Sequence, residues 1–278
     1  MSDQRKVAII GSGSWATALA KLLLNNSEQI NWFIRSQETI DYFREFKHNP
    51  KYISDIEFDT SRIHFYSSIE ETISNSDILV FAIPAPFLKD SLESFKGDFG
   101  DRTIISAIKG IVPAEYLTVA EFFNKNYQVP FRNISIIAGP CHAEEIALER
   151  LSYLTIASST REKSEELAPL FRCHYVKVKS SEDIYGTEYA AVLKNIVAIS
   201  VGICHGLGYG DNFQAVLVSN AMIEIRRFLA KTYKSKRKLL SSPYLGDVMV
   251  TAYSQFSRNR TFGMMIGKGY SVKSAQLE

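Results

Sequence analysis

The feature that most constrains the fold is a glycine-rich turn between a short apolar run and an amphipathic helical pattern near the start of the chain. Lys6–Ile10 is predicted to form a buried strand, and a helix is expected over about Trp15–Asn25. The turn between them contains Gly11-x-Gly13-x-x-Ala16. In this spacing the first glycine makes the tight turn and the second lets a pyrophosphate approach the backbone. The third position takes Gly or Ala for close packing of helix on strand.

The residues after the turn extend this interpretation. Ser14 and Trp15 are expected at the helix N-terminus, where free N–H groups and the positive end of the helix dipole bind phosphate. A tight turn without a ligand is the alternative, but strand, spacing and helix all agree with a nucleotide site. We therefore predict dinucleotide binding at Gly11, Gly13, Ser14, Trp15 and Ala16.

Further short apolar runs end in small residues or proline, as parallel strands in a covered sheet do. They are Ile30–Ile34, Ile78–Ile83, Thr103–Ile108 and Ile134–Ile137, with Leu154–Ala157 and Tyr175–Val178 as extensions of the sheet. Their alternation with helical patterns predicts an α/β fold with a doubly wound sheet. Helical patterns then cover Thr187–Leu207 and Asn212–Thr232. We expect a Rossmann-type dinucleotide-binding domain over 1–183 and an all-α substrate-binding domain over 184–278.

Charge and hydropathy exclude several kinds of partner. The 278 residues carry 32 Lys+Arg against 30 Asp+Glu, too even a balance for a dedicated nucleic-acid binder. The basic run Lys231–Lys238 is expected to be a solvated helix end. The apolar stretch 192–207 contains Lys194, Asn195 and His205, so a buried helix is expected and not a membrane span. No signal peptide is recognised in the first residues, and a cytoplasmic location is expected.

The cysteines suggest neither a disulfide framework nor a metal site. Cys141, Cys173 and Cys204 form no C-x-x-C pair and no even set, which favours a reducing compartment. Each is followed by a histidine, which raises the possibility of zinc. Adjacent side chains diverge on a strand or a helix, however, and we expect no metal.

Arg35 bears on the choice of cofactor. It stands at the end of the second predicted strand, about where a NAD-preferring Rossmann domain places Asp or Glu for the ribose hydroxyl. A guanidinium can pair with a 2′-phosphate or lie against adenine, so the sequence favours NADP(H), with NAD(H) still open. A surface arginine without a ligand is the alternative.

Two lysines and one turn carry polar groups that packing does not require. Lys109 follows a predicted strand, at the edge where open α/β sheets bind ligands. A second polar turn, 138–145, also follows a strand. Lys194 interrupts an otherwise apolar helix, so it either extends its amine to solvent or is buried for chemistry. We favour chemistry, since desolvation lowers the pKa of a lysine toward the range useful for proton transfer.

These segments together resemble a known family. The motifs are GSGSWATALA, SAIKG, AGPCHAEE, AAVLKNIVAISVG, GLGYGDN, YLGDVMVTAYSQFSRNRTFG and MMIGKGYSVKSAQLE. In order, over essentially the whole chain, they resemble the NAD(P)-dependent glycerol-3-phosphate dehydrogenases of the bacterial biosynthetic type. The resemblance implies an enzyme that uses NAD(P)H to interconvert dihydroxyacetone phosphate and sn-glycerol 3-phosphate for phospholipid synthesis. We expect a homodimer that is not embedded in a membrane and does not bind nucleic acid.

The resemblance also implies site residues. Lys194 matches the acid/base, and Lys109 and Asp247 match residues around the reacting carbon. Asn195 and Thr251 lie close to that carbon, and Ser257, Arg258 and Asn259 match the segment that holds the substrate phosphate. Further residues match the cofactor side or the turn between the ligands: Tyr52, Ala143, Arg258, Gly139 and Cys141. The chemistry agrees, because a ketone that gains hydride needs a nearby cation and a proton donor, and a phosphate needs a forked cation.

Two departures from the family pattern leave alternatives open. Cys141 stands where the family has a small hydroxyl residue, which weakens a hydrogen bond. Relatives continue for several tens of residues beyond the position of Glu278, so the chain is either truncated or lacks a lid over the cofactor. A catalytically silent NADP(H)-binding protein is therefore one alternative, and a related two-domain hydroxy-acid dehydrogenase, which shares the same architecture, is another. The Ser257–Arg260 segment has its own alternative, a polar loop that caps a helix.

Overall fold

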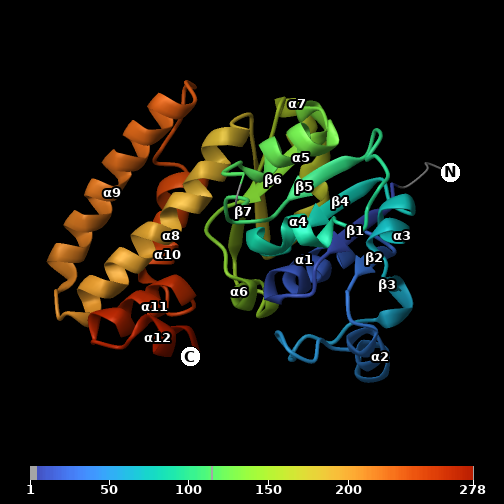
Figure 1. The fold of residues 1–278 in the computed structure, drawn as a ribbon, viewed down its shortest axis with the longest axis horizontal. Helices are drawn as coiled ribbons and strands as arrows, with labels where there is room; N and C mark the ends of the chain where they lie inside the picture. The colour runs from blue at the N-terminus through green and yellow to red at the C-terminus, as the bar shows by residue number, and fades with distance from the viewer. Residues whose placement is uncertain (1–4, 114, 278) are drawn as a thin grey trace. The chain divides into compact units, whose positions relative to one another are not determined.

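The computed structural model describes residues 5–113 and 115–277 (Figure 1). The chain divides into two compact units. One contains the chain up to Ile137 together with His142–Ile184, and the second contains Ala138–Cys141 together with the chain from Tyr185 on. We call them the sheet unit and the helical unit. The outer ends of the two predicted domains, residues 1–4 and 278, lie outside the described residues.

The sheet unit is built on one eight-stranded sheet with the order β3-β2-β1-β4-β5-β6-β7-β8. The pairs β1–β2, β2–β3, β1–β4, β4–β5, β5–β6 and β7–β8 are parallel. The chain extends the sheet on one side of β1 and then returns to add β4 on the other, so the strand order reverses between β1 and β4. Open α/β sheets bind ligands at the carboxyl ends of the strands at such a switch point. The strands are β1 (Val7–Ile10), β2 (Ile30–Phe33), β3 (Ile63–Tyr66), β4 (Ile78–Phe81), β5 (Thr103–Ser106), β6 (Ile134–Ala138), β7 (Ser152–Ser158) and β8 (Val176–Ser181).

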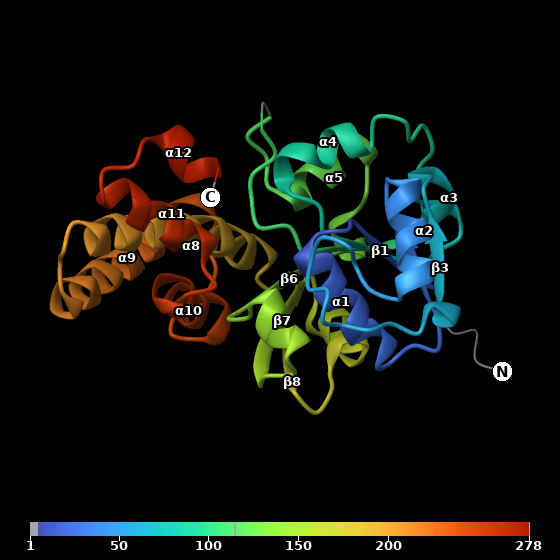
Figure 2. The ribbon, with the colours of Figure 1, turned by 90° about the horizontal axis from the view of Figure 1, so that it is seen from below.

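Helices cover both faces of the sheet, with α4 and α5 on one side and α1 on the other (Figure 2). The first face is covered by α3 (Ile69–Ser74), α4 (Leu88–Ser91) and α5 (Val119–Tyr127), whose apolar residues share one core cluster with β1, β4, β5 and β6. On the other face α1 (Ser14–Leu24) contacts α6 (Ala143–Ala147) and the 3-10 turn Ala168–Phe171, beside α7 (Arg161–Leu167). The fully buried alanines 16, 18 and 20 let α1 approach the strands closely.

Local signals set the helix starts. The Ser36 hydroxyl accepts from the Thr39 N–H at the start of α2 (Gln37–Phe46), and Thr118 and Glu121 form a capping box at α5. Such caps satisfy N–H groups that have no partner within the helix.

The helical unit contains two long helices and several short ones. They are α8 (Ile184–Gly206), α9 (Asp211–Thr232), the π-helical turn Ser242–Gly246, α10 (Asp247–Tyr253), α11 (Arg258–Gly267) and α12 (Val272–Leu277). Its core joins α8, α9 and α10 through buried residues, including Val197 and Val201 of α8, Ile225 of α9 and Val248 of α10.

Glycines bring α8 and α11 into backbone contact. A Cβ at Gly202 would lie 2.1 Å from the Arg260 carbonyl oxygen, and one at Gly263 would lie 2.2 Å from the Ile199 carbonyl oxygen. Gly206 and Gly267 meet one turn further on, each within 3.0 Å of the other's Cα if a Cβ were added. The two helices therefore pack without side chains between them along this glycine seam.

Among the described residues, α8 is the one helix long and apolar enough to cross a membrane by length and composition. A core helix passes the same test, and α8 has the features of one. Ala190, Ala198 and Val201 are buried in the helical unit, and Lys194 is buried with a charged partner. The apolar character of α8 is therefore explained by packing within the unit.

The predicted α/β fold, a Rossmann-type sheet followed by helices, is confirmed. Each predicted strand coincides with an observed one within a few residues, and α8 begins at Ile184, one turn before the predicted start. The strand β3, an edge strand with the sequence Ile63-His64-Phe65-Tyr66, was not predicted. Only Ile63 in it is buried, so β3 lacks the continuous apolar pattern that identifies central parallel strands.

Candidate active site

The glycine turn lies at the switch point of the sheet. Gly11 has φ +127°, and a Cβ there would be 2.7 Å from the Ala82 carbonyl oxygen just after β4. The Gly11 N–H donates to the Phe33 carbonyl at 3.3 Å, and the Trp32 indole N–H donates to the Gly11 carbonyl at 2.7 Å. The turn is therefore fixed from both neighbouring strands, and only glycine fits at position 11.

Gly13 leaves open the space that a pyrophosphate requires. It is the N-cap of α1 with extended backbone, no side chain caps the helix, and the first turn carries no acidic residue. A Cβ on Gly13 would meet no atom of the described residues within 4 Å. Ala16 behind it is fully buried against the sheet. The turn thus offers uncapped N–H groups, the positive end of a helix dipole and room for a phosphate, which fits a dinucleotide.

Asn49 is a residue that the sequence analysis missed. Its side chain is buried, and its amide donates to the Ser12 carbonyl at 3.0 Å and to the Thr17 hydroxyl at 2.9 Å. Its carbonyl oxygen accepts from the backbone N–H of Lys51 and of Tyr52. Asn49 therefore ties the glycine turn to the loop that carries Tyr52, a half-exposed aromatic side chain. Only the two-residue sequence Asn-Pro marked this loop, and that identifies a turn without its partners.

Arg35 directly follows β2 and the buried Ile34, and it precedes the Ser36 N-cap of α2. Its side chain is exposed and has no ion-pair partner among the residues that the structure describes. The guanidinium is therefore available to an anionic group.

Lys109 follows β5 in the sheet unit and is half-buried. Its ammonium lies over the ring of Trp15, 4.8 Å from the ring centroid. Lys109 and Trp15 were both predicted in the site but not as neighbours, and the structure brings them into contact.

Lys194 and Asp247 form a buried ion pair in the helical unit. Lys194 lies in the middle of α8 and Asp247 is the first residue of α10, and their side chains are only 5% and 1% exposed. The ammonium donates to Asp247 Oδ1, while Asp247 Oδ2 has no hydrogen-bond partner among the described residues. Both side chains are buried, and a buried ion pair of this kind holds an amine in a fixed position for proton transfer.

Other predicted substrate residues lie on α8, on α10 and in the turn after β6, and Ala143 lies at the start of α6. The Thr251 hydroxyl donates to the Asp247 carbonyl at 2.7 Å, and Asn195 follows Lys194 on α8. In the turn after β6, Gly139 has φ +131° and Cys141 donates its thiol to the Gly139 carbonyl at 3.4 Å. A Cβ at Gly246 would be 3.5 Å from Pro140, so this turn abuts the start of α10. Ala143 is the first residue of α6 in the sheet unit.

The Ser257–Arg260 segment both caps a helix and presents polar side chains to solvent, the two roles that its sequence suggested. Ser257 is buried and caps α11, with its hydroxyl accepting from the Arg260 N–H at 3.3 Å. Arg258 is exposed, and Asn259 is partly exposed, in the first turn of α11. Ser257 therefore has a structural role, while Arg258 and Asn259 are available to a ligand.

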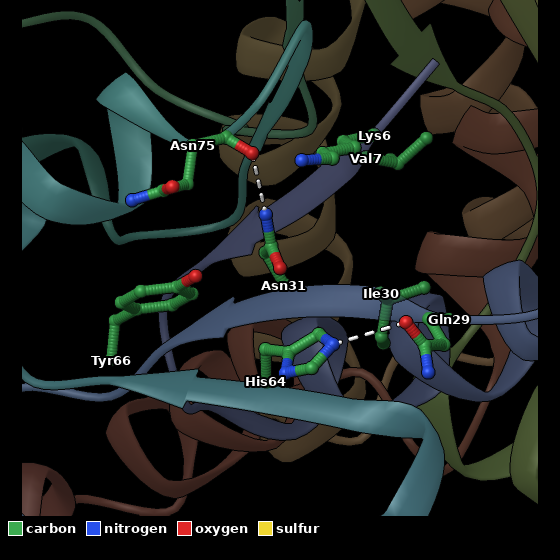
Figure 3. Close-up of a pocket in the computed structure, with 8 residues that line it drawn as sticks. All are labelled: Lys6, Val7, Gln29, Ile30, Asn31, His64, Tyr66 and Asn75. Carbon is green, nitrogen blue, oxygen red and sulfur yellow. Dashed lines mark hydrogen bonds between the residues drawn. The ribbon is translucent and has the colours of Figure 1, made fainter. Parts of the chain in front are cut away.

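Two other observations concern ligands. Among the described residues no group of three or more His, Cys, Asp or Glu is arranged to hold a metal ion, and no disulfide joins two of the three cysteines. A pocket of about 300 Å³ lies beside the first three strands, where Asn31 donates to the Asn75 carbonyl and His64 pairs with Gln29 (Figure 3). It is lined by Lys6, Val7, Gln29, Ile30, Asn31, His64, Tyr66 and Asn75. No predicted site residue lines it.

The fold and the residues define a class of protein. A Rossmann-type sheet with an open glycine turn, together with a buried lysine–carboxylate pair, defines a nicotinamide-dependent dehydrogenase. The family described as NAD-dependent glycerol-3-phosphate dehydrogenase matches through its N-terminal part over residues 6–164 and through its C-terminal part over residues 183–278. The chain belongs to this family, and the predicted resemblance is confirmed.

Individual relatives agree. The glycerol-3-phosphate dehydrogenase (NAD(P)+) of Oceanobacillus iheyensis is 33% identical over 269 residues, which cover 96% of this chain and 78% of the relative. The enzyme of the same name from Bacillus cytotoxicus is 34% identical over 272 residues, covering 96% and 79%. The crystal structure of glycerol-3-phosphate dehydrogenase from Coxiella burnetii superposes with a TM-score of 0.88 at 25% identity, over 98% of this chain and 83% of that one. A D-mandelate dehydrogenase, with a TM-score of 0.59 at 15% identity, shares the fold alone.

Proposed function

We propose that this chain transfers a hydride reversibly between NAD(P)H and dihydroxyacetone phosphate, which yields sn-glycerol 3-phosphate and NAD(P)+ and supplies phospholipid synthesis. The observation that carries the proposal is the buried Lys194–Asp247 pair in a chain that belongs to this dehydrogenase family. The carbonyl carbon gains the hydride and the carbonyl oxygen gains a proton, so the enzyme needs a proton donor and a cation.

The sheet unit binds the cofactor, which supplies or accepts the hydride when bound. The open space at Gly13 and the uncapped first turn of α1 support this role. Arg35 pairs with a 2′-phosphate, so NADP(H) is preferred while NAD(H) is still accepted. The cofactor-binding residues of the proposal are Gly11, Gly13, Ser14, Trp15, Ala16, Arg35, Tyr52, Lys109, Ala143 and Arg258.

Two lysines and one carboxylate carry the chemistry. Lys194 donates the proton to the carbonyl oxygen, or takes it from the hydroxyl in reverse. Asp247 accepts a hydrogen bond from the Lys194 ammonium and thereby fixes its position. Lys109 supplies positive charge against the alkoxide character that develops in the transition state.

Arg258 and Asn259 bind the substrate phosphate at the start of α11. A phosphate dianion pairs best with a forked, permanently charged donor, and the Arg258 guanidinium is exposed with no ion-pair partner among the described residues. The substrate-binding residues of the proposal are Lys109, Gly139, Cys141, Lys194, Asn195, Asp247, Thr251, Ser257, Arg258 and Asn259.

The test is an assay of the purified chain with dihydroxyacetone phosphate and NADPH. Consumption of NADPH matched by formation of sn-glycerol 3-phosphate is the expected result. Nucleotide binding without turnover would identify a silent NADP(H)-binding protein, and turnover of keto acids that lack phosphate would identify a related hydroxy-acid dehydrogenase.

Three further proposals concern the domains, the oligomeric state and the cellular location of the protein. Residues 1–183 form the dinucleotide-binding domain, and residues 184–278 form the substrate-binding domain. The chain is a homodimer, which is supported by Phe213, Val216 and Ile223 of α9, whose apolar side chains are 42%, 58% and 40% exposed. Its location is cytoplasmic, which is supported by three cysteines that form no disulfide with one another among the described residues. Light scattering and cell fractionation test the last two proposals, and a monomer mass or a membrane fraction would contradict them.

A further inference from the structure

Trp15 and Lys109 come from distant parts of the chain and meet at the carboxyl edge of the sheet. Trp15 lies in the first turn of α1 after β1, and Lys109 follows β5. The two strands flank β4, so the residues that follow them can meet above its end. The Lys109 ammonium lies 4.8 Å from the centroid of the Trp15 ring, within the range of a cation–π interaction.

The surroundings of Lys109 differ from those of a lysine in an ordinary ion pair. No carboxylate lies within ion-pair distance of Lys109 among the described residues, although Lys21 and Lys194 each have one. A carboxylate would neutralise the ammonium and occupy its N–H groups. An aromatic face orients the ammonium and leaves both its charge and its N–H groups to a ligand.

Among the described residues, the Trp15 ring makes no hydrogen bond. Its Nε1 atom is buried and has no acceptor among the residues that the structure describes, although the other tryptophan, Trp32, donates to Gly11. A buried indole N–H without an acceptor is unusual in a folded protein, and a ligand can complete such a group.

We propose that Trp15 is a positioning residue that holds the Lys109 ammonium beside the dinucleotide turn and thereby couples cofactor binding to the reacting end of the substrate. The expected effect on turnover rests on the proposed function, whereas the contact between Trp15 and Lys109 is seen in the structure and does not depend on that function. Trp15 also belongs to the cofactor site proposed above, but its effect on the reacting end of the substrate is exerted through Lys109, which acts on the substrate directly. Because α1 begins at the turn that receives pyrophosphate, a change at this turn is transmitted to the lysine through one ring.

The first experiment needs no turnover. The chain has two tryptophans, so the emission lost in Trp15→Phe is that of Trp15. We expect Lys109→Met to change this component in wavelength or intensity, because it removes a charge from the ring face. The matched control is Lys21→Met, which removes a cation 5.8 Å from the Tyr175 ring and leaves Trp15 untouched. An identical Trp15 component in wild type and Lys109→Met would overturn the proposal.

The second experiment is a double-mutant cycle in the full chain with dihydroxyacetone phosphate at saturating NADPH, so that a weaker cofactor affinity does not contribute to kcat/KM for the substrate. Trp15→Leu should lower kcat/KM by about two- to thirtyfold, the range of a cation–π contact, and Trp15→Phe should recover most of the loss. In a Lys109→Met background the same Trp15→Leu change should have an effect below about twofold. Additive losses would show that the ring acts on the cofactor or the fold without Lys109.

Failure of the proposed function and failure of this inference give different results. If dihydroxyacetone phosphate is not the substrate, the wild type shows no turnover, yet Lys109→Met still alters the Trp15 emission. If the inference is wrong, the wild type turns over, the emission is unchanged and the cycle is additive. If Trp15→Leu does not fold, the emission test and Trp15→Phe still decide the question.

Discussion

The sheet unit and the helical unit build their parts of the site from different materials. In the sheet unit the proposed phosphate position is formed by backbone, with space beside Gly13 and uncapped N–H groups in α1. In the helical unit the proposed acid/base position is formed by side chains, with Lys194 and Asp247 both buried. A backbone site is lost when atoms are added, whereas a side-chain site is lost when charges are removed. The two units should therefore respond to opposite kinds of substitution.

The largest effect is expected at Lys194. Lys194→Ala should reduce kcat for dihydroxyacetone phosphate by about 10²–10⁴-fold, the usual contribution of a general acid, while NADPH binding to the sheet unit survives. The variant also leaves Asp247 buried without its cation, at a cost of about 3–5 kcal/mol in the free energy of unfolding. Lys231→Ala, an exposed lysine of α9, is the matched control and should retain wild-type kcat. A near-normal kcat in Lys194→Ala would remove the acid/base assignment.

Gly11 and Gly13 test the backbone character of the other site. Gly11→Ala should lower the free energy of unfolding by about 2–4 kcal/mol, since φ is positive and the Cβ meets the Ala82 carbonyl. Gly13→Ala should change it by less than about 0.5 kcal/mol and instead weaken NADPH binding by about tenfold or more. Urea unfolding and NADPH titration of both variants measure the contrast. Equal destabilisation would show that the space at Gly13 serves folding.

Arg258 tests a second side chain of the helical unit, one that is exposed, whereas Lys194 is buried. Arg258→Ala should lower kcat/KM for dihydroxyacetone phosphate by about 10- to 150-fold, the value of one hydrogen bond to a charged group. The unphosphorylated substrate dihydroxyacetone is the control, and for it the variant and wild type should differ much less. Equal losses on both substrates would place Arg258 on the cofactor or in the fold.

Arg35 is the side-chain element of the sheet unit. Arg35→Asp should weaken NADPH binding by about tenfold or more and NADH binding far less, because only NADPH carries the 2′-phosphate. Equilibrium titration with both nucleotides decides this. Equal weakening would mean that Arg35 contacts the shared adenosine.

The smallest effect concerns alkaline stability of the sheet unit. Burial raises the pKa of Tyr175 to about 12 from the ordinary value of 10. The phenol therefore ionises more easily in the unfolded chain, and its contribution to stability is complete below pH 10 and is lost as the pH rises toward 12. Tyr175→Phe should flatten the decline in unfolding free energy over this window by about 1–2 kcal/mol. Urea unfolding at several alkaline pH values tests it, and an unchanged slope would contradict it.

The sequence predicts those parts of the molecule that depend on local pattern. The Gly11–Ala16 spacing, the buried strands and the apolar helix of Lys194 are local, and the structure has the turn and both kinds of element there. The strand β3 was missed because an edge strand carries little hydrophobic pattern.

Contacts between distant segments could not be predicted from pattern alone. Asn49 reaches the turn at Ser12 across 37 positions, and Lys194 reaches Asp247 across 53. Chain topology decides such contacts, and no spacing rule describes them. The roles of the individual site residues stay predictions until the variants above are measured.

The glycine seam between α8 and α11 has a consequence for how this sequence can vary. A larger residue in a protein interior is commonly accommodated when a neighbour becomes smaller. At Gly202, Gly206, Gly263 and Gly267 the facing atoms are backbone or another glycine, so no neighbour can shrink. A second substitution therefore cannot make room for a larger residue at any of these four positions. Each of these glycines is required whatever residues stand at the other three positions. The close contact of the two helices therefore also fixes the position of Arg258, at the start of α11, relative to Lys194 on α8.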